Sequence, residues 1–282
     1  MFKKLCILVG LFLMSHSANA AEKAGIGAWE NHNHSTLAWI EETPALGWYY
    51  NWRPSQMWQK GQQRRSVEFV PMIHGRTDVN TRIDSDLPVT TILGFNEPDG
   101  DDAGSQSALS VTEAVALWPK LERRGLRLGS PATTQGQTLG RNSWQRRFMD
   151  QIEAKGMRVD FMAVHYYSND GSVSKFRKWL KDVYAEYRRP IWVTEFAFID
   201  WSRPGAVTHE QNARFAEAAI HMMEGLTFVE RHAWFAANPY EWGGHTPEVN
   251  LFDANMRPTP VGLAFNRVLN AVGSIDVASL TN

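Results

Sequence analysis

The segment GFNEPD at residues 94–99 directly follows the apolar, β-branched run VTTIL at residues 89–93. Such a run predicts a β-strand. The proline of the segment lacks an N–H and bars further strand pairing, so Glu97 stands at the C-terminal end of the predicted strand. The run IWVTEF at residues 191–196 has the same form, and it predicts a second strand that ends near Glu195.

Strand-like and helix-like segments alternate in both directions from this region. Eight runs predict strands, at residues 25–29, 48–52, 67–73, 91–95, 127–130, 161–165, 191–196 and 232–236. Amphipathic patterns predict helices at residues 110–124, 143–155, 174–187, 209–224 and 261–271. This alternation favours an α/β fold of the (β/α)8 TIM-barrel type over a doubly wound sheet, and strands that are apolar on both faces support it.

The first half of the predicted barrel is less regular than the second. The segments after the first three strands are short or weakly periodic, so we expect a compact, imperfect barrel with some early helices reduced to turns. The polar loop at residues 99–105 follows Glu97 directly, and we expect it to flank the cleft. The sequence has no internal repeat and no linker rich in Pro or Ser, which predicts a single domain.

The N-terminal residues have the pattern of a signal peptide. Two lysines precede an apolar core at residues 5–14 that is too short to span a bilayer, and Ala-Asn-Ala at residues 18–20 fits a cleavage site. We therefore predict a signal peptide at residues 1–20 and a secreted or periplasmic catalytic domain at residues 21–282, close to the roughly 250 residues of a typical barrel. A retained membrane anchor is the alternative, and the short apolar core disfavours it.

Composition and motifs exclude several partners and cofactors. The formal charge of −1 gives no reason to expect nucleic acid or an anionic membrane as a partner. The single cysteine, Cys6, lies in the predicted signal, so no disulfide is expected. His32 and His34 stand in a polar loop and no HExxH motif occurs, so no metal site is predicted. Gly-Xaa-Ser-Xaa-Gly, P-loop and dinucleotide motifs are absent, so neither a serine hydrolase nor a cofactor is expected.

Glu97 and Glu195 end the fourth and seventh strands of the predicted barrel. Active groups cluster at such strand ends, and these two strands lie across the barrel mouth from each other. Glycoside hydrolysis needs one carboxyl to protonate the leaving oxygen and another to attack the anomeric carbon or activate water. Burial and mutual repulsion can separate the two pKa values. A structural ion pair is the alternative for each glutamate alone, but the two together favour catalysis.

Residues close to the two glutamates are candidates for substrate binding. Asn96 could bind a sugar 2-hydroxyl, with a turn residue as the alternative. Tyr167 ends the sixth strand and could hold a nucleophilic carboxylate, whereas a buried, hydrogen-bonded side chain is the alternative for His165. The candidate substrate-binding residues are Asn96, Tyr167, His165, Trp52, Tyr50, Trp234 and Trp242.

All twelve tryptophans lie outside the predicted signal, and several stand at strand ends or in loops. A tryptophan ring offers a flat apolar face that can stack on the C–H face of a sugar ring. Trp52 ends the second strand, Trp234 lies on the eighth and Trp242 lies in the loop beyond it, so each is a candidate floor for a sugar subsite. Core packing is the alternative, and it applies to Trp118 and Trp179, which stand at helical spacing.

Six segments, in this order, resemble the family 128 glycoside hydrolases, which are small (β/α)8 endo-β-1,3-glucanases of fungi and bacteria. These segments lie at residues 48–52, 69–72, 92–99, 164–167, 192–196 and 233–235. The resemblance extends over most of the mature chain. The Asn-Glu-Pro and Thr-Glu pair is shared more widely with barrel glycosidases that retain anomeric configuration.

The resemblance implies a role for each matched residue. Glu97 would be the acid/base and Glu195 the nucleophile, while Asn96 would contact the 2-hydroxyl and Tyr167 would orient Glu195. With these roles, Glu97 would carry the proton, its pKa raised by burial and by the charge of its neighbour. The sixth strand of the family usually reads His-Trp-Tyr, whereas Tyr166 stands at the middle position here, which weakens any stacking role for it.

The resemblance implies a secreted, monomeric endo-β-1,3-glucanase that acts on β-glucan polysaccharides or oligosaccharides and contacts no membrane after signal cleavage. One alternative is another retaining barrel glycosidase, which would act on β-1,4-xylan or mannan. A second is a non-catalytic glucan-binding protein on a barrel scaffold. The presence of both glutamates argues against the second alternative.

Overall fold

The computed structural model describes residues 23–31, 35–57, 66–102 and 104–279. Its strands are β1 (Ala24–Gly27), β2 (Trp48–Tyr50), β3 (Glu68–Phe69), β4 (Thr91–Ile92), β5 (Arg127–Leu128), β6 (Met162–Ser168), β7 (Ile191–Phe198) and β8 (Val229–Trp234). Its helices are α2 (Ser35–Glu42), α3 (Val111–Glu122), α4 (Trp144–Ala154), α5 (Val173–Tyr187), α6 (His209–Glu224), α7 (Pro260–Ser279) and the 3₁₀ turn η1 (Gln135–Gln137). The predicted signal peptide, His32 and His34 lie outside the described residues.

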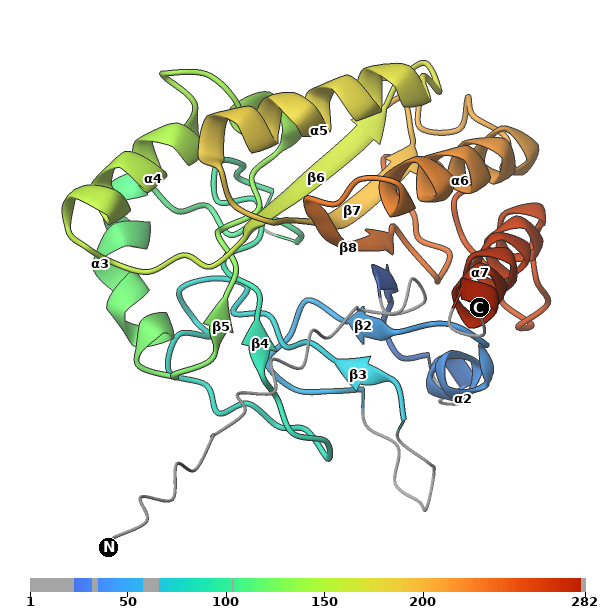
Figure 1. The fold of residues 1–282 in the computed structure, drawn as a ribbon, viewed down its shortest axis with the longest axis horizontal. Helices are drawn as coiled ribbons and strands as arrows, with labels where there is room; N and C mark the ends of the chain where they lie inside the picture. The colour runs from blue at the N-terminus through green and yellow to red at the C-terminus, as the bar shows by residue number, and fades with distance from the viewer. Residues whose placement is uncertain (1–22, 32–34, 58–65, 103, 280–282) are drawn as a thin grey trace, which may run out of the picture.

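The eight strands follow one another in a ring. Six form a parallel sheet in the order β3-β2-β1-β8-β7-β6, and β4 pairs with β5. Single parallel bridges join the two sheets, one between Met72 and Leu93 and the other between Gly129 and Phe161. Figure 1 shows the strands at the centre of the molecule with helices outside them. This arrangement confirms the predicted (β/α)8 barrel class.

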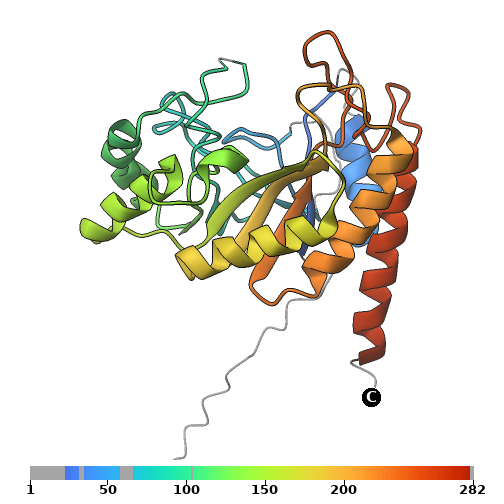
Figure 2. The ribbon, with the colours of Figure 1, turned by 90° about the horizontal axis from the view of Figure 1, so that it is seen from above.

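Helices cover only part of the ring (Figures 1 and 2). Helices α3 to α7 follow β4 to β8 in turn, whereas the described residues between β2 and β3, and between β3 and β4, form no helix. This confirms that some early helices are reduced. Helices α3 and α6 begin at capping boxes formed by Ser110 and Thr208, which accept hydrogen bonds from backbone N–H groups of the first turn. No helix in the described part of the chain is long and apolar enough to cross a membrane.

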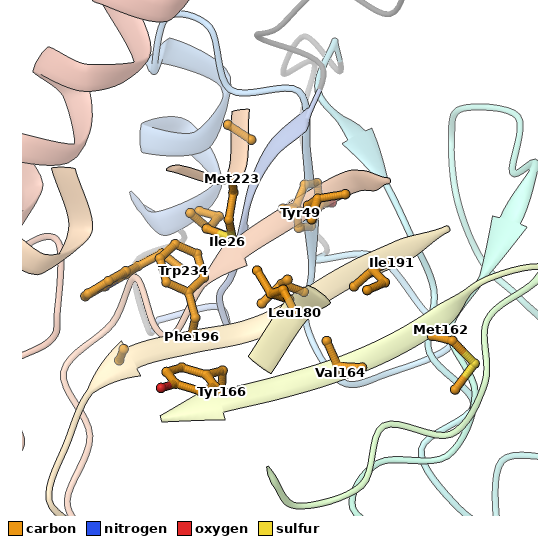
Figure 3. Packing of buried hydrophobic residues seen from close by; sticks show 14 of the residues in the cluster. Ile26, Tyr49, Met162, Val164, Tyr166, Leu180, Ile191, Phe196, Met223 and Trp234 are labelled. Carbon is orange, nitrogen blue, oxygen red and sulfur yellow. The ribbon is translucent and has the colours of Figure 1, made fainter. Parts of the chain in front are cut away.

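Side chains of the strands form two separate cores because successive residues of a strand point to opposite faces. The inner core, within the ring, consists of Trp48, Tyr50, Val70, Met72, Leu93, Ala132, Phe161, Ala163, Trp192 and Ala233. The outer core lies between the strands and the helices, and Figure 3 shows part of it, including Phe196 and Trp234. On β8, therefore, Ala233 belongs to the inner core and its neighbour Trp234 to the outer core.

Candidate active site

Glu97, Glu195 and His165 come together near the C-terminal ends of β4, β7 and β6. Glu195 lies within β7 and is 4 % exposed, whereas Glu97 lies beyond β4 and has 15 % of its side chain exposed. One carboxylate oxygen of each glutamate and one ring nitrogen of His165 all lie within 4.8 Å of one another. The two glutamates therefore face each other, as predicted from their positions, although β7 continues to Phe198, beyond the predicted end of that strand.

Glu97 has an unusual backbone conformation. Its φ angle of +37° lies in the left-handed region, which residues with a side chain seldom adopt. The backbone of the neighbouring strands fixes it: the Glu97 N–H donates to the Ala132 carbonyl at 2.7 Å, and the Asn96 N–H donates to the His74 carbonyl at 2.9 Å. Such conformations persist where the surroundings over-determine them, and they cluster at functional sites.

Hydroxyl and indole groups hold the carboxylate of Glu195. The Trp52 indole N–H donates to Oε1 at 2.9 Å, and the Tyr167 hydroxyl donates to Oε2. The Tyr50 hydroxyl lies 3.3 Å from Oε1, but its single proton is shared with the Thr194 carbonyl at 2.8 Å. Donors of this kind favour the ionised form of a carboxyl. Three of the predicted binding residues thus contact Glu195 itself.

Glu97 is held by side chains from two different parts of the chain. His165 Nδ1, on β6, lies 2.8 Å from Glu97 Oε1. Gln106 Nε2 donates to Glu97 Oε2 at 2.8 Å from the loop between β4 and α3, residues 99–110, which we call the β4 loop. The sequence analysis expected residues 99–105 of this loop to flank the cleft but did not identify Gln106 as a site residue. The contact depends on the loop folding back onto the strand end, which no local pattern indicates.

His165 lies between the two carboxyls and is fully buried. The pairing of β6 with β7 sets His165 beside Glu195, next to a register shift after Val164. Its Nε2 atom lies 3.4 Å from Glu195 Oε1. A buried, hydrogen-bonded histidine was the alternative interpretation of this residue. That interpretation describes its surroundings, but the partner of His165 is Glu97, so His165 belongs to the site.

The three groups shift one another's pKa values. Burial lowers the pKa of His165. The charge of Glu195 and the hydrogen bond and charge of Glu97 raise it, and together they outweigh burial, so the net shift is upward. Burial raises the pKa of Glu97, but the hydrogen bond and charge of His165 and the hydrogen bond from Gln106 outweigh it, so the net shift is downward. Burial, followed by the charge of Glu97, holds the pKa of Glu195 above its usual value. These directions are opposite to the expected order, with the higher pKa on Glu97, because His165 bonds Glu97 more closely and Glu195 is the more buried carboxyl.

The arrangement of Glu97, His165 and Glu195 also has the donor set of a metal site, since each offers one ligand atom. In the described structure these atoms already take part in the hydrogen bonds and close polar contacts given above. That the protein needs no metal stays a prediction.

The remaining predicted binding residues lie in different surroundings. Asn96 is 4 % exposed; its Nδ2 donates to the Ser105 carbonyl at 2.9 Å, and its Oδ1 has no hydrogen-bond partner. Trp242 lies in the loop after β8 and is 39 % exposed. Trp234 is fully buried, packs edge-on against Phe196 and donates its indole N–H to the Val249 carbonyl at 2.8 Å (Figure 3). Trp234 is therefore a core residue, and the prediction that it stacks on a sugar is wrong.

Trp201 is an aromatic residue that sequence reasoning missed. It follows β7 and is 37 % exposed, and its ring lies 5.0 Å from that of Tyr167 and 5.4 Å from that of Trp242 between centroids. Tyr167 and Trp201 both line a cavity of about 620 Å³, which falls within the size range of ligand pockets. The polar side chains of Gln135 and Asp200 also line it. Trp242 was predicted because it lies in the loop after a strand. The same criterion applied to the loop after β7 would have identified Trp201.

Paired glutamates near the C-terminal ends of the fourth and seventh strands of a barrel are the arrangement of a glycoside hydrolase. A family model described as the glycosyl hydrolase catalytic core matches residues 26–265. A family 128, subgroup I endo-β-1,3-glucanase from Amycolatopsis mediterranei, solved with laminaritriose and laminaribiose, is 31 % identical, with a TM-score of 0.74 over 88 % of this chain and 99 % of that one. The chain therefore belongs to glycoside hydrolase family 128 and is an enzyme of the glycoside hydrolase class.

More distant relatives differ in what they do. A subgroup V exo-β-1,3-glucanase from Cryptococcus neoformans is 23 % identical, with a TM-score of 0.71 over 88 % of this chain and 99 % of that one. A subgroup VII oligosaccharide-binding protein from Trichoderma gamsii is 20 % identical, with a TM-score of 0.69 over 88 % and 94 %. Alkali-sensitive linkage protein 1 of Schizosaccharomyces pombe is 28 % identical over 71 % of this chain, which spans 38 % of that protein. At 23 % and 20 % identity, the matches to the Cryptococcus and Trichoderma proteins show only that the fold is shared.

Proposed function

We propose that this chain is an endo-β-1,3-glucanase that hydrolyses laminarin-type glucan and retains anomeric configuration. The observation that carries the mechanism is the closeness of the two carboxyls, with an oxygen of Glu97 within 4.8 Å of an oxygen of Glu195. Retaining enzymes keep their two carboxyls about 5–5.5 Å apart, whereas inverting enzymes need about 6.5–9.5 Å to admit a water molecule. Two carboxyl oxygens this close leave little room for a water molecule between them, which supports direct attack by a carboxylate.

The hydrogen-bond partners divide the two roles. Trp52 and Tyr167 donate to Glu195 and favour its carboxylate form, which suits it to attack the anomeric carbon. Glu97 is the more exposed carboxyl, and a bound glycoside that covers it removes water and so favours its protonated form. His165, whose pKa is raised, lies 2.8 Å from Glu97 Oε1 and is a near source of the proton that Glu97 passes to the leaving oxygen.

Aromatic rings around Glu195 suit a bound glucosyl unit. Trp52 packs against Trp29 at 5.9 Å and against Phe235 at 5.8 Å, and Phe235 packs against Tyr167 at 5.5 Å, all between ring centroids. Apolar ring faces beside a carboxylate match a sugar, which has C–H faces and hydroxyl edges. The unpartnered Oδ1 of the buried Asn96 is an acceptor suited to the 2-hydroxyl of the sugar at the point of cleavage.

A longer glucan chain has a path beyond this unit. Tyr167 contacts Trp201, Trp201 contacts Trp242, and both tryptophans are more than one third exposed. The cavity beside Tyr167 and Trp201 extends the same path. We propose that these residues bind further glucosyl units, as expected of an enzyme that cuts within a chain.

The choice of β-1,3-glucan rests on likeness. The Amycolatopsis enzyme, solved with laminari-oligosaccharides, is 31 % identical and almost fully covered. We infer a secreted or periplasmic location from the sequence of residues 1–20 and expect the protein to act as a monomer. An oligosaccharide-binding role, which is that of the Trichoderma protein, is the second candidate. Against it, this chain has both glutamates, with His165 within hydrogen-bond distance of Glu97 and Trp52 within hydrogen-bond distance of Glu195.

The test is hydrolysis of laminarin, curdlan, xylan and mannan, followed by product analysis with laminari-oligosaccharides of defined length. We expect cleavage of the β-1,3-glucans alone, release of several oligosaccharide lengths at once, and a β-anomer as the first-formed product. Release of glucose alone would indicate exo action, and an α-anomer formed first would indicate inversion. Binding without hydrolysis would favour the second candidate. N-terminal sequencing of the exported protein tests cleavage before Ala21.

A further inference from the structure

The β4 loop reaches back to Glu97 through one side chain. Gln106 Nε2 donates to Glu97 Oε2 at 2.8 Å, and the opposite end of the same amide, Oε1, accepts the Asp102 backbone N–H at 3.0 Å. A backbone N–H can only donate, so it fixes which end of the amide is oxygen. The end that faces Glu97 is therefore the NH₂ group, and it offers the carboxyl only a donor.

The loop is folded so that this amide has room. A Cβ atom at Gly100 would overlap the amide of Gln106, whereas a Cβ at Gly104 would meet only Asp102 Oδ1 at 3.7 Å. The Gln106 N–H also donates to the Asp102 carbonyl at 2.8 Å, and the Ser107 N–H donates to the Asn96 carbonyl at 3.0 Å. The loop is thus closed on itself at Gln106 and tied to the strand end at Ser107.

We propose that Gln106 is a positioning residue for Glu97: it holds the carboxyl in the orientation from which it passes its proton to the leaving oxygen. With Oε1 on His165 and Oε2 on Gln106, each oxygen of Glu97 has a hydrogen-bond partner, and the two bonds together restrain rotation of the carboxyl. Fixed geometry matters because a small misplacement of a catalytic group can cost about a hundredfold in rate. The inference rests on the proposed function, since it takes Glu97 as the acid/base.

The loop also affects the protonation of Glu97. The hydrogen bond from Gln106 lowers the pKa of Glu97, after the larger effects of burial, which raises it, and of His165, which lowers it. The other titratable groups that interact with Glu97 are His74, Glu195, Tyr50 and Tyr167. Removal of the Gln106 donor with those groups unchanged therefore moves the pKa of Glu97 upward.

The first test compares two substrates in the variant Gln106→Met, which keeps the length of the side chain but removes the donor. We expect kcat/KM for a laminari-oligosaccharide to fall about tenfold or more. For a dinitrophenyl laminari-oligoside, whose leaving group needs no proton, we expect little change. An equal effect on both substrates would mean a structural role and would overturn the proposal.

The second test measures Glu97 directly and does not depend on activity. In a Glu195→Gln background, which leaves one carboxyl of the pair to titrate, carbon-13 NMR of labelled glutamate follows the ionisation of Glu97. Gln106→Met should move this titration to higher pH, and an unchanged titration would overturn the proposal. Failure of the proposed function has a different signature: the wild-type protein would not cleave β-1,3-glucan, or Glu97→Ala would leave cleavage intact.

A matched pair of glycine substitutions covers the case in which Gln106→Met does not fold. Gly100→Ala displaces the Gln106 amide, whereas Gly104→Ala adds the same methyl group to the same loop, where it meets only Asp102 Oδ1 at the ordinary contact distance of 3.7 Å. We expect Gly100→Ala to show the selective loss on the laminari-oligosaccharide and Gly104→Ala to behave as wild type. Equal behaviour of the two variants would overturn the proposal.

Discussion

The two halves of the ring hold their glutamates in different ways. Strands β6, β7 and β8 run for seven, eight and six residues, whereas β3, β4 and β5 have two residues each. Glu195 lies within the long strand β7, and its closest donors are Tyr167 on β6 and Trp52, two residues beyond β2. Glu97 stands beyond a short strand and depends on the β4 loop and His165. The proposed nucleophile is thus built on regular backbone and the proposed acid/base on a loop.

The largest expected effect separates the roles of the two halves. Glu195→Ala should lower turnover about 10⁴-fold or more on glucan and on dinitrophenyl substrates alike, because both pass through the same covalent step. Assays with both substrates check this, with thermal unfolding as the control for folding. Azide supplied as a replacement nucleophile should yield an α-glycosyl azide. Near-normal turnover of either substrate would remove Glu195 from the role of nucleophile.

Glu97→Ala should have a large but selective effect. Glucan hydrolysis should fall about 10²–10⁴-fold, the usual worth of general acid–base catalysis. Formation of the glycosyl-enzyme from a dinitrophenyl substrate should persist, because that leaving group needs no proton. Azide should then accelerate turnover and yield a β-glycosyl azide, the opposite anomer to that from Glu195→Ala. If both variants gave the same anomer, the assigned division of roles would be wrong.

Tyr167→Phe sharpens the comparison on the side of the long strands. The Tyr167 hydroxyl donates to Glu195 and lowers its pKa, so its removal should raise that pKa further. Glu195 then ionises only at higher pH, and the acidic limb of the kcat/KM profile should move to higher pH. The loss of a hydrogen bond to a charged group should cost about 1.5–3 kcal/mol in kcat/KM at the optimum. A pH–rate profile measures both, and a shift to lower pH would contradict the contact.

The smallest effect on the substrate is expected at Trp242, one of two tryptophans to which the sequence analysis gave the same role. Trp242→Ala should weaken binding of a long laminari-oligosaccharide by about 1–3 kcal/mol, by analogy with stacking of bases on aromatic rings, and leave folding intact. Trp234→Ala should instead lower the free energy of unfolding by about 3–5 kcal/mol, because its ring fills the outer core. Calorimetry and denaturant unfolding measure the two quantities. An affinity loss confined to Trp234→Ala would reverse this distinction.

The barrel could be predicted because its signals are local. Apolar β-branched runs, helix caps and the proline after Glu97 each act within a few residues, and the strand ends then gather the two glutamates. The orientation of Trp234 could not be predicted in the same way. Ala233 and Trp234 are both apolar, so the pattern of β8 does not tell which of them points into the ring.

Contacts that depend on loop folding or on irregular strand pairing could not be predicted from the sequence either. Gln106 reaches Glu97 only because the β4 loop turns back on hydrogen bonds that have no sequence pattern. The reversed order of the two carboxyl pKa values depends on His165, which lies beside Glu195 at a register shift in the β6–β7 pair. Sequence reasoning placed these residues at the correct end of the barrel but could not assign their partners.

The single bridges that close the ring have a consequence for inactivation by heat. Strands β4 and β5 join the rest of the ring through the Met72–Leu93 and Gly129–Phe161 bridges and a few further backbone hydrogen bonds. Segments with little such pairing open at a lower free energy than the whole fold. Glu97 follows β4, whereas Glu195 lies on β7. Warming should therefore misalign the two carboxyls while β6 to β8 remain folded. Activity should therefore disappear at a lower temperature than the circular dichroism of the helices.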